Sequence, residues 1–268
     1  MTRAFAYIVA ENSNPDKLQD CTVPYLVNKE IIFFGPCKKR LRQLLSDMAN
    51  SKFTEDHYLI GLNASNGKKE RKIIWVGKIK MALTFYQAWN EVKDNPAFRG
   101  MIDNDYSPIH IRPIVQNGEL KGYKHVSKMH GEDGKWILDL ISSTKDNRIE
   151  IAEDSASIRV RDGFNSSCVL NRDCCFILEN IFFAQIGGIE IDSDILKIFQ
   201  DSQKERKDID KYALFGRQSN GNADGKIGGW LELKDNLAKK LINLIESRAK
   251  KLGQGDSINS AGVKRGGC

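Results

Sequence analysis

The chain has 268 residues and a formal net charge of +6, from 41 Lys and Arg against 35 Asp and Glu. This length can bury a full hydrophobic core, as one large domain or as one domain with an appendage. No stretch approaches the roughly 20 apolar residues of a membrane-spanning helix, and the apolar run at 4–10 is too short for a signal peptide. The sequence therefore predicts no membrane partner and a cytoplasmic location.

Short strands and few helices are expected in the first half of the chain. Apolar or alternating runs predict strands at 4–10, 31–34, 58–62 and 71–80. The last two flank a polar, Gly-containing loop at 63–69, so we expect them to form a β-hairpin. A helix over 36–49 is predicted after the Gly35-Pro36 turn, because proline fits the first turn of a helix.

The second half is predicted to end in a long helix. Thr84 can cap a helix that runs through Trp89, and residues 94–136 read as irregular. Leucines at three- and four-residue spacing predict a helix over 231–251, and the Gly- and Ser-rich tail from 253 is expected to be mobile. Further strands are predicted at 157–160, 167–170 and 175–178.

Together these elements predict an α+β protein. Its centre would be a compact, strongly curved β-sheet or a small β-barrel, with flanking helices and a helical C-terminal extension. The predicted division is a domain over 1–190, a helical extension over 191–252 and a flexible tail over 253–268.

The six cysteines predict neither a disulfide framework nor a bound metal ion. They form no CxxC pair, and no histidine stands at zinc-ligand spacing from them. Scattered cysteines without a secretory signal are typical of a reducing cytosol. Nothing in the pattern calls for a cofactor. The cysteines are Cys21, Cys37, Cys168, Cys174, Cys175 and Cys268.

Positive charge is concentrated in one block of the chain. Residues 33–80 hold eleven Lys and Arg against four Asp and Glu, a local charge of +7 that leaves −1 for the rest. A basic block on a near-neutral body favours nucleic acid over a membrane surface as the partner. The helix after Pro36 would add its free N–H groups and dipole to this charge. The predicted phosphate contacts are Lys38, Lys39, Arg40, Arg42, Lys68 and Lys69.

A second interpretation of the basic block needs no ligand. The helix after Pro36 could be a solvated amphipathic helix with Leu41, Leu44 and Leu45 facing the core, and the loop at 63–69 could be polar for solubility alone. From this segment the two interpretations remain equally open.

Aromatic residues offer stacking surfaces for a base. An aromatic platform stabilises a bound base by roughly 1–3 kcal/mol, and an extruded base also needs hydrogen bonds to its edge. The candidates for stacking are Trp75, Tyr86, Trp89 and Trp136, and those for reading a base edge are Asn12 and Asn14. The alternatives are that the aromatic residues form core and that the asparagines form a turn.

One group of residues could support acid–base catalysis, and one thiol could act as a nucleophile. Histidines and acidic residues gather between 103 and 130, although the sequence does not fix their geometry. Cys37 beside Lys38 at a helix start is expected to have a lowered pKa, but no partner base is identifiable. The acid–base candidates are Asp103, Asn104, His110, His125 and His130.

The order of several segments resembles a known family. The first half contributes Tyr7-Ile8-Val9-Ala10, Gly35 to Arg42, His57 to Gly61, Ile74 to Lys80 and Leu83 to Trp89. The later stretches are Asp103-Asn104, His130-Gly131, Ser167 to Leu170 and Ile181 to Phe183. Over residues 4–190 the chain resembles the nucleotide modification associated domain of the second type, which is linked to phage and bacterial systems that hypermodify DNA bases.

More distantly, the first ninety residues resemble the PUA-like domains, which include the EVE, ASCH and YTH domains. The chain departs from them at Asp56-His57-Tyr58, where Gly-Asp is usual. This resemblance implies a pocket for a modified base, lined by aromatic side chains and polar backbone groups.

The leading hypothesis is therefore a module that binds a modified base or nucleotide in nucleic acid, DNA in particular, within a DNA-modification or anti-phage system. The alternative is an enzyme, a transferase or hydrolase acting on a nucleotide or modified base through the histidine region or Cys37. A third hypothesis is a structural subunit whose basic block docks an acidic partner. The sequence does not indicate the oligomeric state.

Overall fold

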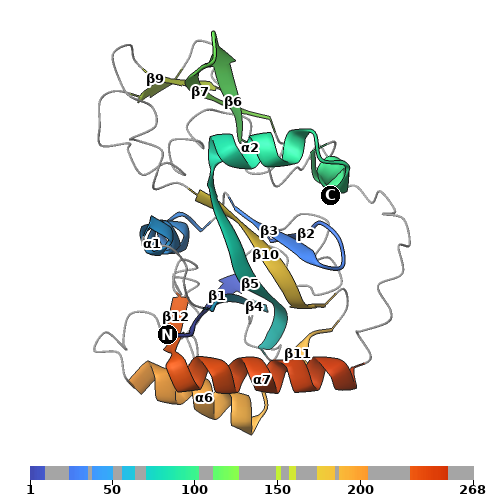
Figure 1. Ribbon diagram of the computed structural model, residues 1–268. Helices are drawn as coiled ribbons and strands as arrows, with labels where there is room; N and C mark the ends of the chain where they lie inside the picture. The colour runs from blue at the N-terminus through green and yellow to red at the C-terminus, as the bar shows by residue number, and fades with distance from the viewer. Residues whose placement is uncertain are drawn as a thin grey trace, which may run out of the picture. The chain divides into compact units, whose positions relative to one another are not determined.

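The chain folds into two compact units, each assembled from separate stretches of sequence. The computed structural model describes residues 1–9, 24–35, 38–50, 56–63, 71–102, 111–126, 149–151, 157–160, 174–184, 187–204 and 230–252 (Figure 1). Unit 1 comprises Met1–Thr22, Thr54–Ile79 and Glu179–Cys268, and unit 2 comprises Val23–Phe53 and Lys80–Leu178. This division differs from the predicted 1–190 domain with a 191–252 extension, because both ends of the chain belong to unit 1.

A mixed β-sheet forms the centre of unit 1. Its strands are β12 (Trp230–Lys234), β1 (Arg3–Val9), β4 (His57–Asn63), the first part of β5 (Lys72–Thr84) and the second part of β10 (Cys174–Phe183), in this spatial order, with β11 (Ile189–Glu190) also paired to β5. β1 and β4 are parallel, whereas β1 and β12, and β4 and β5, are antiparallel. The described strands form no closed barrel, so the open-sheet form of the α+β prediction is confirmed.

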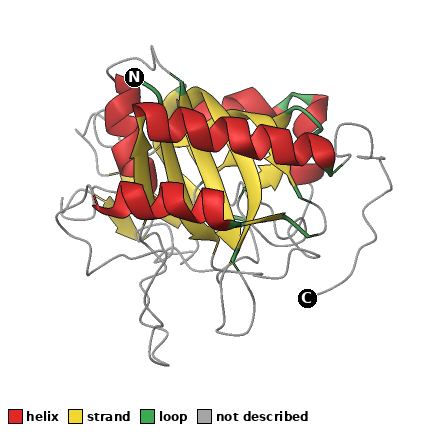
Figure 2. Ribbon diagram, turned by 90° about the horizontal axis from the view of Figure 1, so that it is seen from below, coloured by secondary structure: helices red, strands yellow, loops and turns green. Residues whose placement is uncertain are grey.

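Two helices cover one face of this sheet (Figure 2). They are α6 (Ser193–Lys204) and α7 (Asp235–Lys251). Apolar residues at three- and four-residue spacing, such as Leu241 and Ile245, are fully buried in one core with Ala4 and Ile60 of the strands. Burying apolar surface in this way is the main favourable term in folding. The C-terminal helices are therefore part of the core of unit 1.

The predicted helix over 231–251 is wrong in its first four residues. Leu231 and Leu233 are buried and alternate with more exposed neighbours, as in a strand with one covered face. They belong to β12, which pairs with β1, and α7 begins only at Asp235. Leu233 also stands four residues before Leu237, which is why the helical pattern appears to start early.

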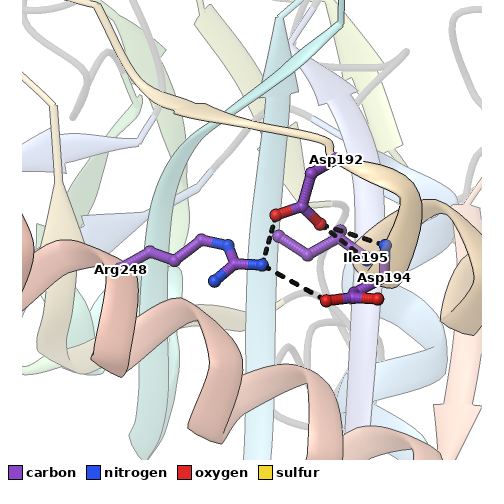
Figure 3. A network of polar contacts seen from close by, with 4 residues as sticks. All are labelled: Asp192, Asp194, Ile195 and Arg248. Carbon is purple, nitrogen blue, oxygen red and sulfur yellow. Dashed lines mark hydrogen bonds and ion pairs between the residues drawn. The ribbon is translucent and has the colours of Figure 1, made fainter.

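An ion-pair network joins the start of α6 to the last turns of α7 (Figure 3). Asp192 Oδ1 accepts hydrogen bonds from the backbone N–H groups of Asp194 and Ile195, each at 3.1 Å, and so caps α6. Arg248 pairs with the carboxylate of Asp192, and its Nη2 lies 3.7 Å from Asp194 Oδ2. The hydrogen bond from Ile195, followed by the contact with Arg248, lowers the pKa of Asp192.

Unit 2 holds a second sheet and a separate core. Its sheet has the order β6-β7-β9-β8 and is antiparallel throughout. The strands of this sheet are β6 (Ile111–Gln116), β7 (Glu119–His125), β8 (Ile149–Ile151) and β9 (Ser157–Val160). The described helices of unit 2 are α1 (Lys39–Asn50), α2 (Phe85–Lys93), the 3-10 helix η2 (Pro96–Phe98) and α3 (Arg99–Ile102). The short strands β2 (Tyr25–Leu26) and β3 (Ile31–Phe34), the end of β5 and the start of β10 also belong to this unit.

The prediction that residues 94–136 are irregular is wrong for much of this range. β6 and β7 form a hairpin whose two-residue turn is Asn117-Gly118. Both turn residues have positive φ, 52° and 79°. Asn-Gly adopts such a turn at little cost, and its twist matches that of the flanking strands. The strand signals on both sides therefore belong to one hairpin.

Most other predicted elements are confirmed. The strands expected at 4–10, 31–34, 58–62, 71–80 and 157–160 correspond to β1, β3, β4, β5 and β9, and 175–178 lies within β10. The strand expected at 167–170 lies outside the described residues. The first helix begins at Lys39, after Lys38 with φ 60°, and so later than the predicted Pro36. In the described part of the chain, no helix combines the length and apolar character needed to cross a membrane.

Candidate functional site

The candidate site of unit 2 is built on α2, whose start is fixed by a capping box. The Thr84 hydroxyl accepts a hydrogen bond from the Gln87 N–H at 3.2 Å, and the Gln87 side chain accepts one from the Thr84 N–H at 3.0 Å. This reciprocal pair satisfies two N–H groups that a helix start otherwise leaves without a partner. It sets where the helix begins, and with it the positions of Tyr86 and Trp89.

The inner face of α2 is anchored in the core of unit 2. Phe85, Ala88 and Val92 are buried at helical spacing, and the Phe85 ring meets the Tyr123 ring edge-on, with 6.0 Å between ring centres. Tyr86 and Trp89 are only partly buried. Because they stand three residues apart on the helix, they are neighbours on its surface.

Arg112 of β6 stacks on Trp89. The guanidinium carbon lies 4.9 Å from the centre of the Trp89 ring, a cation–π contact. Arg112 Nη2 also donates a hydrogen bond to the carbonyl oxygen of Ile102, at 3.3 Å. The partly exposed Trp89 ring of α2 and the guanidinium of β6 are thus brought together, with Tyr86 three residues before Trp89 on the same helix. Such a group can stack on a flat ligand and bind an anion.

Trp75, a predicted stacking residue, is part of the core of unit 1. Its side chain is 0% exposed, and its ring meets the Tyr7 ring edge-on, with 5.9 Å between ring centres. It also lies directly against Gly61 across the β4–β5 pair. A ligand cannot reach this ring, so the core interpretation weighed from the sequence holds for Trp75.

Arg42, a predicted phosphate contact, is in the interior of unit 2. It is 0% exposed, its Nη1 donates to the Cys174 carbonyl oxygen at 3.1 Å, and its guanidinium carbon lies 5.2 Å from the centre of the Phe85 ring. Arg42 shares its face of α1 with Leu41 and Leu45, which are also buried, so the amphipathic pattern of the helix directs Arg42 inward. The structure therefore excludes Arg42 from a surface phosphate site.

The other predicted phosphate contacts of this segment lie at the start of α1. Lys38 and Lys39 are partly exposed, and the side chain of Arg40 lies outside the described set. Their predicted contact with phosphate stays a prediction.

Of the predicted catalytic residues, only His125 is described. It lies on β7 opposite Ile111 and is 4% exposed, so it is not open to a substrate from solvent in this structure. No cluster of His, Cys, Asp and Glu that could hold a metal ion is found in the described ranges. The predicted site residues outside those ranges are Asn12, Asn14, Cys37, Lys68, Lys69, Asp103, Asn104, His110, His130 and Trp136.

Sequence reasoning did not identify Arg112, which lies in the range read as irregular. The Asn117-Gly118 pair was the available signal, since it predicts a hairpin and places Arg112 on the first of its strands. The contact of Arg112 with Trp89 depends on how β6 packs against α2, and no local pattern reports that.

Comparison with protein-family models, with curated proteins and with solved structures finds no match to the chain. The resemblance to the nucleotide modification associated domain therefore stays a prediction based on the order of the sequence segments.

Proposed function

We propose that unit 2 binds a modified base or nucleotide in nucleic acid, with Tyr86 and Trp89 as the stacking surface and Arg112 beside them. The observation that carries the proposal is the stacked guanidinium of Arg112, 4.9 Å from the ring centre of a partly exposed tryptophan. Aromatic side chains with an adjacent arginine are a recurrent means of holding single-stranded or extruded bases.

The exposed polar groups of Tyr86 and Trp89 are able to form hydrogen bonds with the edge of a bound base. The Trp89 indole N–H and the Tyr86 hydroxyl are not among the buried polar atoms, and neither has a hydrogen-bond partner among the described residues. An indole N–H donates, and a phenol both donates and accepts. These groups can therefore add selectivity to the stacking, which by itself tolerates every base.

Two parts of the proposal depend on the sequence: that the nucleic acid is DNA, and that the protein acts in a DNA-modification or anti-phage system. A basic block of +7 over residues 33–80 supports a polyanionic ligand. The resemblance to the nucleotide modification associated domain supports DNA and a DNA-modification or anti-phage system. A cytoplasmic location fits the same proposal.

The enzyme alternative has less support. Of the three candidate histidines, only His125 is described, and it is buried at 4% exposure. A transferase or hydrolase that uses His110 or His130 rests on the sequence alone, as does a structural subunit that docks an acidic partner.

The test is a binding panel of modified and unmodified nucleotides and oligonucleotides, measured for the wild type and for Tyr86→Ala and Trp89→Ala. Losing one stacking residue should weaken binding about tenfold, consistent with roughly 1–3 kcal/mol per stacked base. Asn90→Ala is the matched control, because Asn90 is exposed on the same helix. Unchanged binding in both aromatic variants, or no binding by the wild type to any member of the panel, would overturn the proposal.

A further inference from the structure

We infer that the solvent side of α7 in unit 1 binds the phosphate backbone of duplex nucleic acid. The stacking residues of the proposed function belong to unit 2, so this inference goes beyond that function and does not depend on it. The contact assigned to α7 is one that does not distinguish base sequences.

The side of α7 turned away from the sheet carries positive charge and no carboxylate (Figure 2). From residue 239 to the end of the helix, every exposed residue is a lysine, an asparagine or a serine. At 1.5 Å per residue, the row from Lys240 to Lys251 is about 17 Å long. The six exposed residues, called the outer face below, are Lys239, Lys240, Asn243, Ser247, Lys250 and Lys251.

The two acidic residues of α7 do not belong to the outer face. Asp235 is the first residue of the helix, one turn before Lys239, and Glu246 is partly buried. The hydrogen bond from Lys78 and, to a smaller extent, the charge of Lys239 lower the pKa of Asp56. Asp56 thus compensates part of the charge of Lys239, and the argument depends on the other lysines of the outer face.

The neighbouring helix α6 does not neutralise these lysines either. It exposes Asp194 and Lys197, and Asp194 Oδ2 lies 3.7 Å from Nη2 of Arg248, which also pairs with Asp192. Apart from Lys239, the lysines of the outer face have no ion-pair partner among the described residues. Their charge is therefore available to an anion from solvent.

The stability of the helix explains only some of these lysines. Cations in the last turn interact favourably with the helix dipole, which applies to Lys250 and Lys251. Lys240 lies in the second turn, where the dipole gives no such gain. A face that needs only to be solvated carries charges of both signs, whereas the outer face carries one.

Duplex nucleic acid is the partner that suits the outer face. Lysine, asparagine and serine all bind phosphate oxygens, and a duplex carries one negative charge per about 1.7 Å of its axis. Protein interfaces are poor in lysine and have apolar or aromatic centres, and the outer face has no such residue. A membrane-bound helix turns its apolar side to lipid, whereas Leu241 and Ile245 are buried in the core of unit 1.

The test uses the full chain and a fluorescently labelled duplex DNA of arbitrary sequence, titrated by anisotropy over a series of NaCl concentrations. The charge-removal variant is the double substitution Lys240→Gln, Lys251→Gln. It should weaken binding about tenfold and reduce the slope of log affinity against log salt by about 2, because two phosphate contacts are lost. The converse variant Ser247→Lys adds a charge between these positions and should raise the slope by about 1.

The matched control is the double variant Lys72→Gln, Lys78→Gln. It removes the same charge from unit 1, at lysines that already pair with Glu190 and Asp56, and should change the salt slope much less. Thermal melting confirms that each variant is folded. A wild-type slope in the charge-removal variant, or an equal change in the control, overturns the inference.

A second arm distinguishes nucleic acid from other polyanions. Unlabelled duplex, poly-glutamate and vesicles of phosphatidylserine and phosphatidylcholine compete with the labelled duplex at equal concentrations of negative charge. The unlabelled duplex should displace it best. Poly-glutamate or vesicles that displace it equally well would overturn the inference in favour of an acidic protein or a membrane surface.

The same measurements separate this inference from the proposed function. If Tyr86→Ala and Trp89→Ala weaken binding to the oligonucleotide panel while the charge-removal variant keeps the wild-type affinity and slope, the stacking surface stands and the outer face is wrong. If only the charge-removal variant loses binding, the outer face stands and the stacking surface is wrong. If the wild type binds no nucleic acid even at low salt, both are wrong.

Discussion

Gly61 of β4 lies directly opposite Trp75 of β5, and the indole occupies the space that a side chain at position 61 would need. A Cβ atom built on Gly61 would lie 1.7 Å from Trp75 Nε1 and 2.1 Å from its Cδ1. The absence of a side chain at position 61 is thus what allows the tryptophan to be 0% exposed between β4 and Tyr7.

Gly61→Ala should therefore destabilise the protein. The added methyl group must displace a buried indole that is enclosed by the core of unit 1, and overpacking of this kind typically costs about 1–3 kcal/mol. Urea unfolding of the variant measures the loss. Gly100→Ala is the control, because its Cβ would meet only the Tyr25 hydroxyl, at an ordinary 3.5 Å. Equal stabilities for Gly61→Ala and the wild type would show that the indole is not held as described.

The capping box of α2 predicts a difference between two conservative substitutions. Thr84→Ala removes the hydroxyl that accepts from the Gln87 N–H and should lower the free energy of unfolding by about 1 kcal/mol. Thr84→Ser keeps the hydroxyl and should lie close to the wild type. Thermal or chemical denaturation of both variants checks this, and a Thr84→Ser variant as unstable as Thr84→Ala would contradict the role of the cap.

The Asp192–Arg248 contact predicts a pH-dependent contribution to stability. The N–H of Ile195, and then Arg248, hold the pKa of Asp192 below its ordinary value of 3.8. A carboxyl group whose pKa is lower in the folded state stabilises the fold above its unfolded pKa, and this contribution is lost as the pH falls through the lowered folded pKa.

Asp192→Asn should consequently cost about 0.5 kcal/mol at neutral pH, as expected for a partly exposed ion pair at a helix start. The cost should vanish in acid, where the wild-type carboxyl is itself protonated. Unfolding experiments at both pH values test this, with Asp194→Asn as the control at the more exposed carboxyl. A loss of the same size at both pH values would rule out the ion pair as its source.

Local patterns in the sequence were sufficient to predict most of the described strands and the residue that caps α2. The strand over 157–160 and the cap at Thr84 follow from residue type alone, since alternation and hydroxyl caps are local properties. The hairpin at Asn117-Gly118 was also readable, but the polar residues around it led to an irregular assignment. The start of α7 was misplaced because Leu233 fits both a strand and a helix.

The candidate site depended on tertiary packing and was only partly predictable. Trp75 and Trp89 are the same type of residue, yet the first is enclosed by Gly61 and Tyr7, whereas the second is partly exposed and in contact with Arg112. In the same way, the burial of Arg42 follows from its orientation toward Phe85 and Cys174, which lie far from it in the chain. Spacing along the sequence does not distinguish a buried ring or guanidinium from an exposed one.

The most direct test of the account compares Trp75→Ala with Trp89→Ala in two measurements on the same samples, the free energy of unfolding and the affinity for a single-stranded oligonucleotide. Trp75→Ala should lose about 3–5 kcal/mol of stability, as core tryptophans do, and any change in affinity should follow from unfolding alone. Trp89→Ala should lose about tenfold in affinity with a much smaller loss of stability. If Trp89→Ala instead loses stability as Trp75→Ala does and the folded fraction binds as tightly as the wild type, Trp89 is a core residue and the proposed binding surface is wrong.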